Sequence, residues 1–223
     1  VLLALPRDEV NVRVFRLPST NEAEVASMVG WRVRREPGFS HKDVLLVHRV
    51  VGRDRDGWMR IVVYGVARPK LLERLKALDR VGVTVDTVTV ETQGLVDWTR
   101  GGAALEALIH AEGDRFEWSV VRDGVPVFSR SFRARCFGPG AGDELLRELS
   151  VSQGIFRQWY PEWASGLIPL NALGVLSACH MEVIRPRLNG RGDRDLLIFD
   201  GERGRVPRSL IPLIGLALKG SSD

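Results

Sequence analysis

The order of hydrophobic segments between residues 10 and 90 constrains the fold of this chain more than any other feature. Alternating or short continuous apolar runs are typical of strands, and they recur at 10–17, 44–51, 59–67 and 83–90. Between them, the stretches at about 20–35 and 69–82 carry apolar residues at helical spacing. The predicted order is strand, helix, strand, strand, helix, strand, which is a split βαβ arrangement in a small α+β unit.

Capping and turn residues support these boundaries. Residues 19–21 read Ser-Thr-Asn and can cap the first helix, whose first turn carries Glu22 and Glu24, where the helix dipole favours acids. The polar turn 53–57 joins the second and third strands as a hairpin. Pro69 suits the first turn of the second helix, where its missing N–H costs nothing.

The remainder of the chain predicts a second region of mixed structure. Residues 100–102, Arg-Gly-Gly, are the best candidate for a linker. Helices are expected at 91–98, from Asp143 onward, at 172–184 and at 207–220. Strands are expected at 105–110, 116–121, 125–132, 167–170 and 196–199.

Charge and cysteine content exclude several classes of protein. The net charge of the 223-residue chain is +4, and its arginines alternate with acidic and apolar residues. Solvated helix and strand faces are therefore expected rather than a nucleic-acid surface, and an arginine-rich RNA-binding protein stays as an alternative. Cys136 and Cys179 are too few for a disulfide framework or a zinc site, which predicts two reduced thiols. His41 and His48 lack a third convergent ligand, so no metal is expected.

The ends of the sequence and its hydropathy bear on location. The most apolar stretch, 209–218, is shorter than the ~20 residues that a spanning helix needs, and no signal peptide is visible. Residues 1–5 already read as an apolar strand with no initiating Met. We therefore expect a protein that lies beside a membrane if it acts there, and a start trimmed from a longer chain.

Four stretches of the sequence together resemble the PilM/GspL family of actin-like proteins. The first is 3–6 with 14–18, and the second is the helix with Trp31 together with the hairpin 44–67 and the segment 75–90. The third is the hairpin 120–130, and the fourth is the segment 207–220. The resemblance covers nearly the whole chain and implies an α+β, actin-like fold of two RNase H-like lobes with nucleotide between them. It implies that 1–9 end a strand of the first lobe, that 10–90 form the inserted split βαβ subdomain, and that 91–223 supply the remainder of the lobes.

The resemblance also locates the residues that would face a nucleotide. An actin-like site needs glycines that let backbone N–H groups reach phosphate, and carboxylates that hold hydrated magnesium. After the strand at 105–109, the position of the family's aspartate holds His110. Glu112, Gly113 and Asp114 could serve only in a shifted register.

The other two parts of the nucleotide site are also altered. The adenosine loop of the family carries two adjacent glycines, whereas 171–174 read Asn-Ala-Leu-Gly, and the first phosphate hairpin would precede Val1.

We expect no cofactor and no enzymatic activity. The alternatives are an ATP-binding assembly protein whose site is completed by residues preceding Val1, and a relative of the sugar and acetate kinases. The candidate cofactor-binding residues are Glu112, Gly113, Asp114 and Gly174.

The family further implies a cytoplasmic scaffold, peripheral to the inner membrane, in a type IV pilus or type II secretion assembly. Its implied partner is the cytoplasmic tail of a bitopic inner-membrane protein, with an assembly ATPase as a further partner. The strand 10–17 is our candidate edge for that tail, through Arg13, Phe15 and Arg16. The aromatic cluster with Trp159 and Trp163 is either a partner anchor or a helix end packed on the core.

Overall fold

The computed structural model of the chain forms two compact units, Val1–Glu91 and Thr92–Asp223, here called unit 1 and unit 2. The structure describes residues 1–18, 21–33, 35–36, 39, 43–54, 56–99, 104–163, 168–174, 178–184 and 186. The linker predicted at 100–102, the strand predicted at 196–199 and the helix predicted at 207–220 therefore lie outside the described residues.

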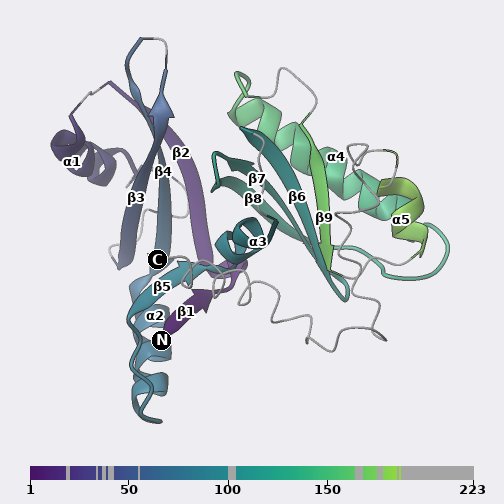
Figure 1. Ribbon diagram of the computed structural model, residues 1–223, viewed down its shortest axis with the longest axis horizontal. Coiled ribbons are helices and arrows are strands. Elements are labelled where there is room, and N and C mark those ends of the chain that lie inside the picture. Colours follow the sequence, from purple (N-terminus) through teal and green to yellow (C-terminus); the bar gives the residue numbers. More distant parts are fainter. Residues whose placement is uncertain are drawn as a thin grey trace. The chain divides into compact units, whose positions relative to one another are not determined.

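Unit 1 is built on a three-stranded antiparallel sheet in the order β2-β4-β3 (Figure 1). Its strands are β2 (Val10–Leu17), β3 (Val44–Arg53) and β4 (Met59–Ala67). Helix α1 (Glu22–Val33) connects β2 to β3, and β4 lies between these two strands. The predicted split βαβ arrangement is thus confirmed for β2, α1, β3 and β4, whereas the predicted fourth strand is wrong as a member of this sheet, because β5 belongs to a separate sheet with β1. Helix α2 (Arg68–Asp79) follows β4.

One face of this sheet and α1 enclose the core of unit 1. The N–H of Ala23 donates to Asn21 Oδ1, so the predicted cap is formed. Phe39 packs so closely on Gly65 that a Cβ added there would lie 2.6 Å from its ring. The buried residues of this core are Phe15, Leu17, Val25, Val29, Val33, Phe39, Met59, Ile61 and Val63.

A separate two-stranded parallel sheet joins the two ends of unit 1. Strand β1 (Leu2–Leu5), which the 3-10 turn Arg7–Glu9 follows, pairs with β5 (Thr87–Val90). The strand predicted from residue 83 begins four residues later, because the N–H of Val83 still bonds to Leu78 O at the end of α2. Gly82, at φ +75°, provides the left-handed residue that this helix ending requires.

Unit 2 contains a four-stranded sheet in the order β8-β7-β6-β9 (Figure 1). The first three strands are antiparallel neighbours, whereas β9 runs parallel to β6. The strands are β6 (Leu105–Glu112), β7 (Arg115–Arg122), β8 (Val125–Arg133) and β9 (Leu170–Gly174). The helices are α3 (Glu91–Thr99), α4 (Ala141–Trp159) and α5 (Ala178–Ile184).

The two faces of this sheet differ in chemistry. On one face, α4 packs Phe156 against Trp118 of β7 and Phe128 of β8. On the other, Leu95 and Val96 of α3 form a buried cluster with apolar residues of β6 and β7. This second face also carries the buried polar side chains Glu106, Glu117 and Ser119.

The helix predicted at 172–184 is wrong at its start. Residues 172–174 belong to β9, which pairs with β6, and α5 begins only at Ala178. Strand pairing thus overrides the local pattern, as is common for short apolar segments. On α4, Leu145 and Leu149 are buried as expected, but Phe156 rather than its neighbour Ile155 is the buried residue of the last turns.

Candidate functional site

The four predicted cofactor-binding residues lie at one end of the sheet of unit 2. Strand β6 ends at Glu112 and turns through Gly113 and Asp114 into β7. The parallel register pairs Ala111 of β6 with Gly174, the last residue of β9. The carboxyl ends of β6 and β9 therefore meet, and the structure brings this predicted set together.

The turn at 112–114 is held by the segment that follows β8. Arg133 Nη1 donates to Asp114 Oδ2 at 3.0 Å, and the N–H of Ala134 donates to Asp114 O at 3.0 Å. Cys136 Sγ donates to Gly113 O at 2.6 Å, and Gly113 has a φ of +61°. The Arg133 guanidinium thus forms an ion pair with the Asp114 carboxylate. It neutralises the negative charge with which that carboxylate would bind a magnesium ion.

His110 lies beside a buried polar network instead of at an open cleft position. Its cross-strand partner is Glu117, which accepts hydrogen bonds from Thr92 Oγ1 at 2.6 Å and Ser119 Oγ at 2.7 Å. His110 Nε2 is buried and has no hydrogen-bond partner among the described residues. Burial lowers the pKa of His110, and the nearby charges of Glu117 and Glu112 only partly oppose this.

These features do not fit a magnesium–phosphate site. The position of the family's aspartate holds a half-buried imidazole whose lowered pKa favours the neutral form, and the neighbouring Asp114 is paired with Arg133. In the part of the chain that the structure describes, no three His, Cys, Asp or Glu side chains gather closely enough to hold a metal ion.

The half-buried His110, whose Nε2 is enclosed, predicts a pH dependence of stability. The unfolded chain protonates a histidine near pH 6.5, whereas the folded chain resists protonation of His110 because its pKa is lowered. Below about pH 6.5 the unfolded state thus binds more protons, and stability falls by at most about 1.4 kcal/mol per pH unit. We expect His110→Gln to flatten the fall in urea midpoint between pH 7.5 and 5. An unchanged slope would contradict this.

A second cluster of functional side chains lies at the end of β2, against the tip of the β3–β4 hairpin. Arg16 forms ion pairs with Asp54 through Nε and with Asp56 through Nη2, and its guanidinium lies 4.2 Å from the centre of the Trp58 ring. Asp54 Oδ1 accepts from the N–H of Trp58 at 2.9 Å, which closes the tip. The cluster is defined as Arg16, Asp54, Asp56 and Trp58, and we call it the β2-end cluster.

Among the strands that the structure describes, β2 lies at an edge of its sheet, as the tail-binding prediction requires. Arg16 is exposed on this strand, and Arg13 is half-buried and donates to Val12 O at 3.0 Å. Phe15 is only 7% exposed and belongs to the core under α1. Its prediction as a partner contact is corrected, because its side chain points to the helix-covered face of the sheet.

The aromatic cluster after α4 divides between core and surface. Trp163 is 7% exposed, stacks on Tyr160 at 5.4 Å and lies beneath Arg122, so its prediction as a partner contact is also corrected. Trp159 is 41% exposed while its ring lies 5.6 Å from that of Phe128. The contact of Trp159 with a partner remains a prediction.

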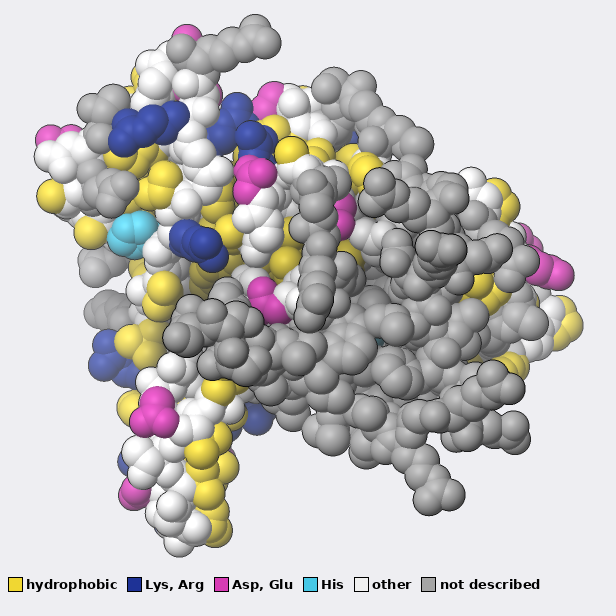
Figure 2. Space-filling view, in the orientation of Figure 1, with side chains coloured by type: hydrophobic (Ala, Val, Ile, Leu, Met, Phe, Trp, Pro, Cys, Tyr) yellow, Lys and Arg dark blue, Asp and Glu magenta, His cyan; other side chains and the backbone are white. Residues whose placement is uncertain are grey.

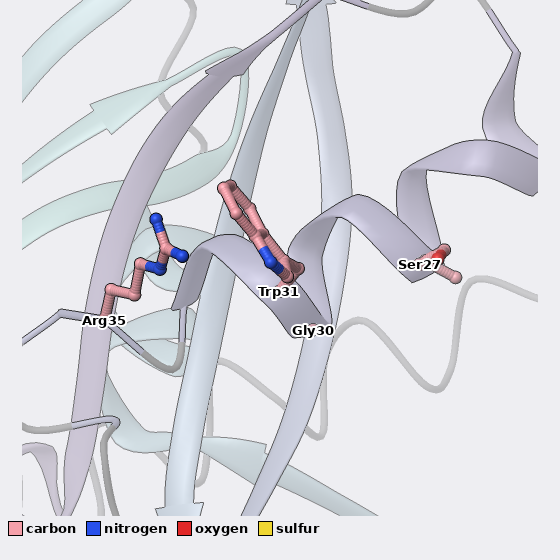
Figure 3. Close-up of a pocket in the computed structure, with 5 residues that line it drawn as sticks. Ser27, Gly30, Trp31 and Arg35 are labelled. Carbon is pink, nitrogen blue, oxygen red and sulfur yellow. The ribbon is translucent and has the colours of Figure 1, made fainter.

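The sequence reasoning missed a depression on the outer surface of α1. It measures about 500 Å³ and is lined by Ala26, Ser27, Gly30, Trp31 and Arg35 (Figure 3). Trp31 is 62% exposed, and the Arg35 guanidinium lies 4.0 Å from the centre of its ring. A signal was present, since Trp31 falls outside the apolar stripe formed by Val25, Val29 and Val33.

The visible surface of unit 1 carries its basic side chains in separate places, among hydrophobic and acidic ones (Figure 2). Nucleic-acid faces instead concentrate Lys and Arg in one patch or stripe. None of the helices in the described residues is both long and apolar enough to cross a bilayer.

Solved structures that align with this chain identify its fold. A protein chain of the "PilM-PilN type IV pilus biogenesis complex" aligns with TM-score 0.65 and 14% identity, over 98% of this chain and 79% of its own. A second similar structure is the cytoplasmic domain of EpsL, an inner-membrane component of the type II secretion system of Vibrio cholerae. It aligns with TM-score 0.56 and 15% identity, over 97% of this chain and 74% of its own. The chain has the actin-like fold of these proteins.

Both units are included in these alignments, since each covers nearly the whole chain. A protein of unknown function from Bacteroides thetaiotaomicron with an actin-like ATPase fold aligns more weakly, at TM-score 0.42 and 10% identity, over 83% of this chain and 63% of its own. No family model and no curated protein matches the chain. The resemblance seen in the sequence is thus confirmed at the level of the fold.

Proposed function

We propose that this chain is a non-enzymatic scaffold of a type IV pilus or type II secretion assembly. It acts in the cytoplasm, at the inner membrane, and binds the cytoplasmic tail of a bitopic membrane protein, with an assembly ATPase as a further partner. The fold supports this, because PilM is found in a complex with PilN and EpsL is an inner-membrane component of a secretion system.

The edge position of β2 is the observation that carries the proposal. An extended peptide adds to a sheet edge through main-chain hydrogen bonds, and it gains affinity without a deep pocket. The eight residues of β2 span about 26 Å at the usual rise per residue, and Asn11, Arg13 and Val14 within the strand already make interactions. The tail therefore pairs with the end of the strand that carries Arg16.

The β2-end cluster supplies side-chain recognition at the end of that edge. Trp58 is partly exposed, and Arg16 holds its ring on one side while fixing both aspartates. A tail that pairs with β2 therefore reaches a rigid aromatic surface beside fixed charges. Exposed aromatic and arginine side chains of this kind dominate the binding energy of many interfaces.

A charge reversal tests this arrangement. Arg16→Glu removes both ion pairs and places a third carboxylate beside Asp54 and Asp56, so the hairpin tip loosens. We expect at least a tenfold loss of affinity for a fluorescently labelled peptide of the proposed partner's cytoplasmic tail, measured by anisotropy. Arg49→Glu is the matched control, because Arg49 is exposed on β3, the opposite edge of the same sheet.

Two results would contradict the proposal. An equal loss in both variants would show that only net charge attracts the peptide. Tight binding of ATP and magnesium in calorimetry, abolished by Asp114→Ala, would favour the nucleotide-dependent alternative. The position of Gly174 beside the 112–114 turn is the feature on which that alternative depends.

A further inference from the structure

The two cysteines of the chain come together at the start of α5, although 43 positions separate them in the sequence. Cys136 lies in the segment between β8 and α4, and Cys179 is near the start of α5, with its Sγ 3.8 Å from Cys136 O. Because the oxygen and the Cβ of one residue are about 3 Å apart, Cys136 Cβ lies within about 7 Å of the Cys179 sulfur. A disulfide requires the two Cβ atoms about 3.8 Å apart, so a side-chain rotation and a local shift of a few ångströms bring the thiols to bonding distance.

The start of α5 is held in place, whereas the segment with Cys136 can adjust. His180 Nε2 lies 2.8 Å from Arg135 O, and His180 is 1% exposed. Gly142 of α4 approaches α5 so closely that an added Cβ would lie 3.0 Å from Cys179 O. The segment between β8 and α4 lies outside helices and strands and contains two glycines at positive φ. Cys179 is therefore the fixed partner, and the Cys136 segment moves toward it.

Cys136 also helps to hold the 112–114 turn. Its thiol donates to Gly113 O at 2.6 Å. A disulfide uses the same sulfur and leaves it without a hydrogen to donate. Bond formation with Cys179 therefore removes one of the contacts that fix the turn.

We propose that Cys136 and Cys179 form a reversible disulfide that switches the 112–114 turn between a held and a released state. The oxidant is a small-molecule disulfide of the glutathione class. The thiolate of Cys179 attacks one sulfur of the oxidant, forms a mixed disulfide and expels one thiolate. The thiolate of Cys136 then attacks the Cys179 sulfur, which closes the protein disulfide and expels the second thiolate. The two cysteines lose two electrons and two protons, and the oxidant gains them as two thiols.

The surroundings of Cys136 set the order of these steps and their pH dependence. Burial raises the pKa of the Cys136 thiol, and the negative charges of Asp114 and of a Cys179 thiolate raise it further. Cys136 therefore attacks second, when Cys179 is already uncharged in the mixed disulfide. Both side chains are half-buried, so a small disulfide reaches them. Because each step needs a thiolate, closure should become at least tenfold faster between about pH 7 and 8.5.

Intact-mass spectrometry of the native chain tests the disulfide directly. In a buffer of about 1 mM oxidised and 1 mM reduced glutathione, we expect a monomer lighter by about 2 Da, the mass of two hydrogens, which excess reductant restores. A digest without reductant should contain the Cys136 and Cys179 peptides joined. Cys136→Ser is the matched control, because its hydroxyl still donates to Gly113 O while no disulfide can form. This variant should stop at the mixed disulfide, heavier by the mass of one glutathione.

Hydrogen exchange measures the effect on the turn. Peptides that cover 112–114 should exchange at least about threefold faster in the oxidised wild type than in the reduced wild type, because one contact of the turn is lost. Cys136→Ala removes the donor without making a bond, so the reduced variant should reproduce the faster exchange. Cys136→Ser should keep the slower exchange.

Three results would overturn the proposal. Thiols that stay reduced in the native chain and oxidise only in urea would show that folding keeps them apart. Disulfides that join two chains would show that the thiols meet other molecules rather than each other. Equal exchange at 112–114 in the oxidised and reduced wild type would show that the disulfide leaves the turn held. Because β2 belongs to unit 1 and both cysteines to unit 2, tail binding should be unchanged in Cys136→Ser, so the two proposals can fail separately.

Discussion

Phe156→Ala should lower the free energy of unfolding of unit 2 by about 3–5 kcal/mol. Phe156 is 1% exposed, and its ring lies 6.0 Å from Trp118, 5.6 Å from Phe128 and 5.3 Å from Tyr160. Removing it loses the transfer energy of a buried ring and leaves a cavity between α4 and the sheet, because its neighbours are held by their own packing. Urea denaturation followed by tryptophan fluorescence measures the change.

Val151→Ala on the same helix is the control for this prediction. Val151 is exposed, so its truncation removes little buried surface and should change stability by less than about 0.5 kcal/mol. If Phe156→Ala cost no more than this control, α4 would not be packed on the sheet as the structure shows.

Phe39→Ala should lower the free energy of unfolding of unit 1 by about 3–5 kcal/mol, and Gly65→Ala by about 1–3 kcal/mol. Phe39 is fully buried, and a Cβ on Gly65 would lie 2.6 Å from two carbons of its ring. The alanine therefore forces Phe39 out of its position in the core. Denaturation curves of both single variants and the double variant give the coupling between the two sites.

The double variant is the decisive member of this set. Once Phe39 is alanine, the added Cβ at residue 65 meets no ring and only the milder contact with Val44 Cγ1 at 3.2 Å remains, so Gly65→Ala should cost less than in the wild type, about 1 kcal/mol or below. Additive effects would show that Gly65 is needed for some reason other than the close approach of Phe39.

Local sequence patterns predicted most of the elements but not all of their pairings. The strand predicted at 59–67 matches β4, because alternating residues and the flanking turn fix both its ends. The segment at 172–174 was predicted as helix, because its partner β6 lies more than 60 residues earlier and no local pattern reveals that pairing. The late start of β5 likewise depends on the left-handed Gly82 and the Val83 hydrogen bond that follow the end of α2.

The candidate site was predicted in part. The sequence located the 112–114 turn and the edge strand β2, since both follow from strand order. It could not reveal that Arg133 engages Asp114, because that contact depends on where β8 ends. Phe15 and Trp163 were predicted as partner contacts, but both side chains are buried. The sequence could not reveal this, because neither a strand pattern nor an aromatic cluster indicates which side chains face the core.

Titration of the wild-type chain with the cytoplasmic tail peptide of the neighbouring bitopic protein tests the scaffold hypothesis most directly. Isothermal calorimetry without nucleotide should give saturable one-to-one binding with a dissociation constant below about 50 μM, in the range of peptides that add to a sheet edge. Absence of binding at that concentration, or binding that appears only when ATP and magnesium are added, would contradict a scaffold that acts without nucleotide.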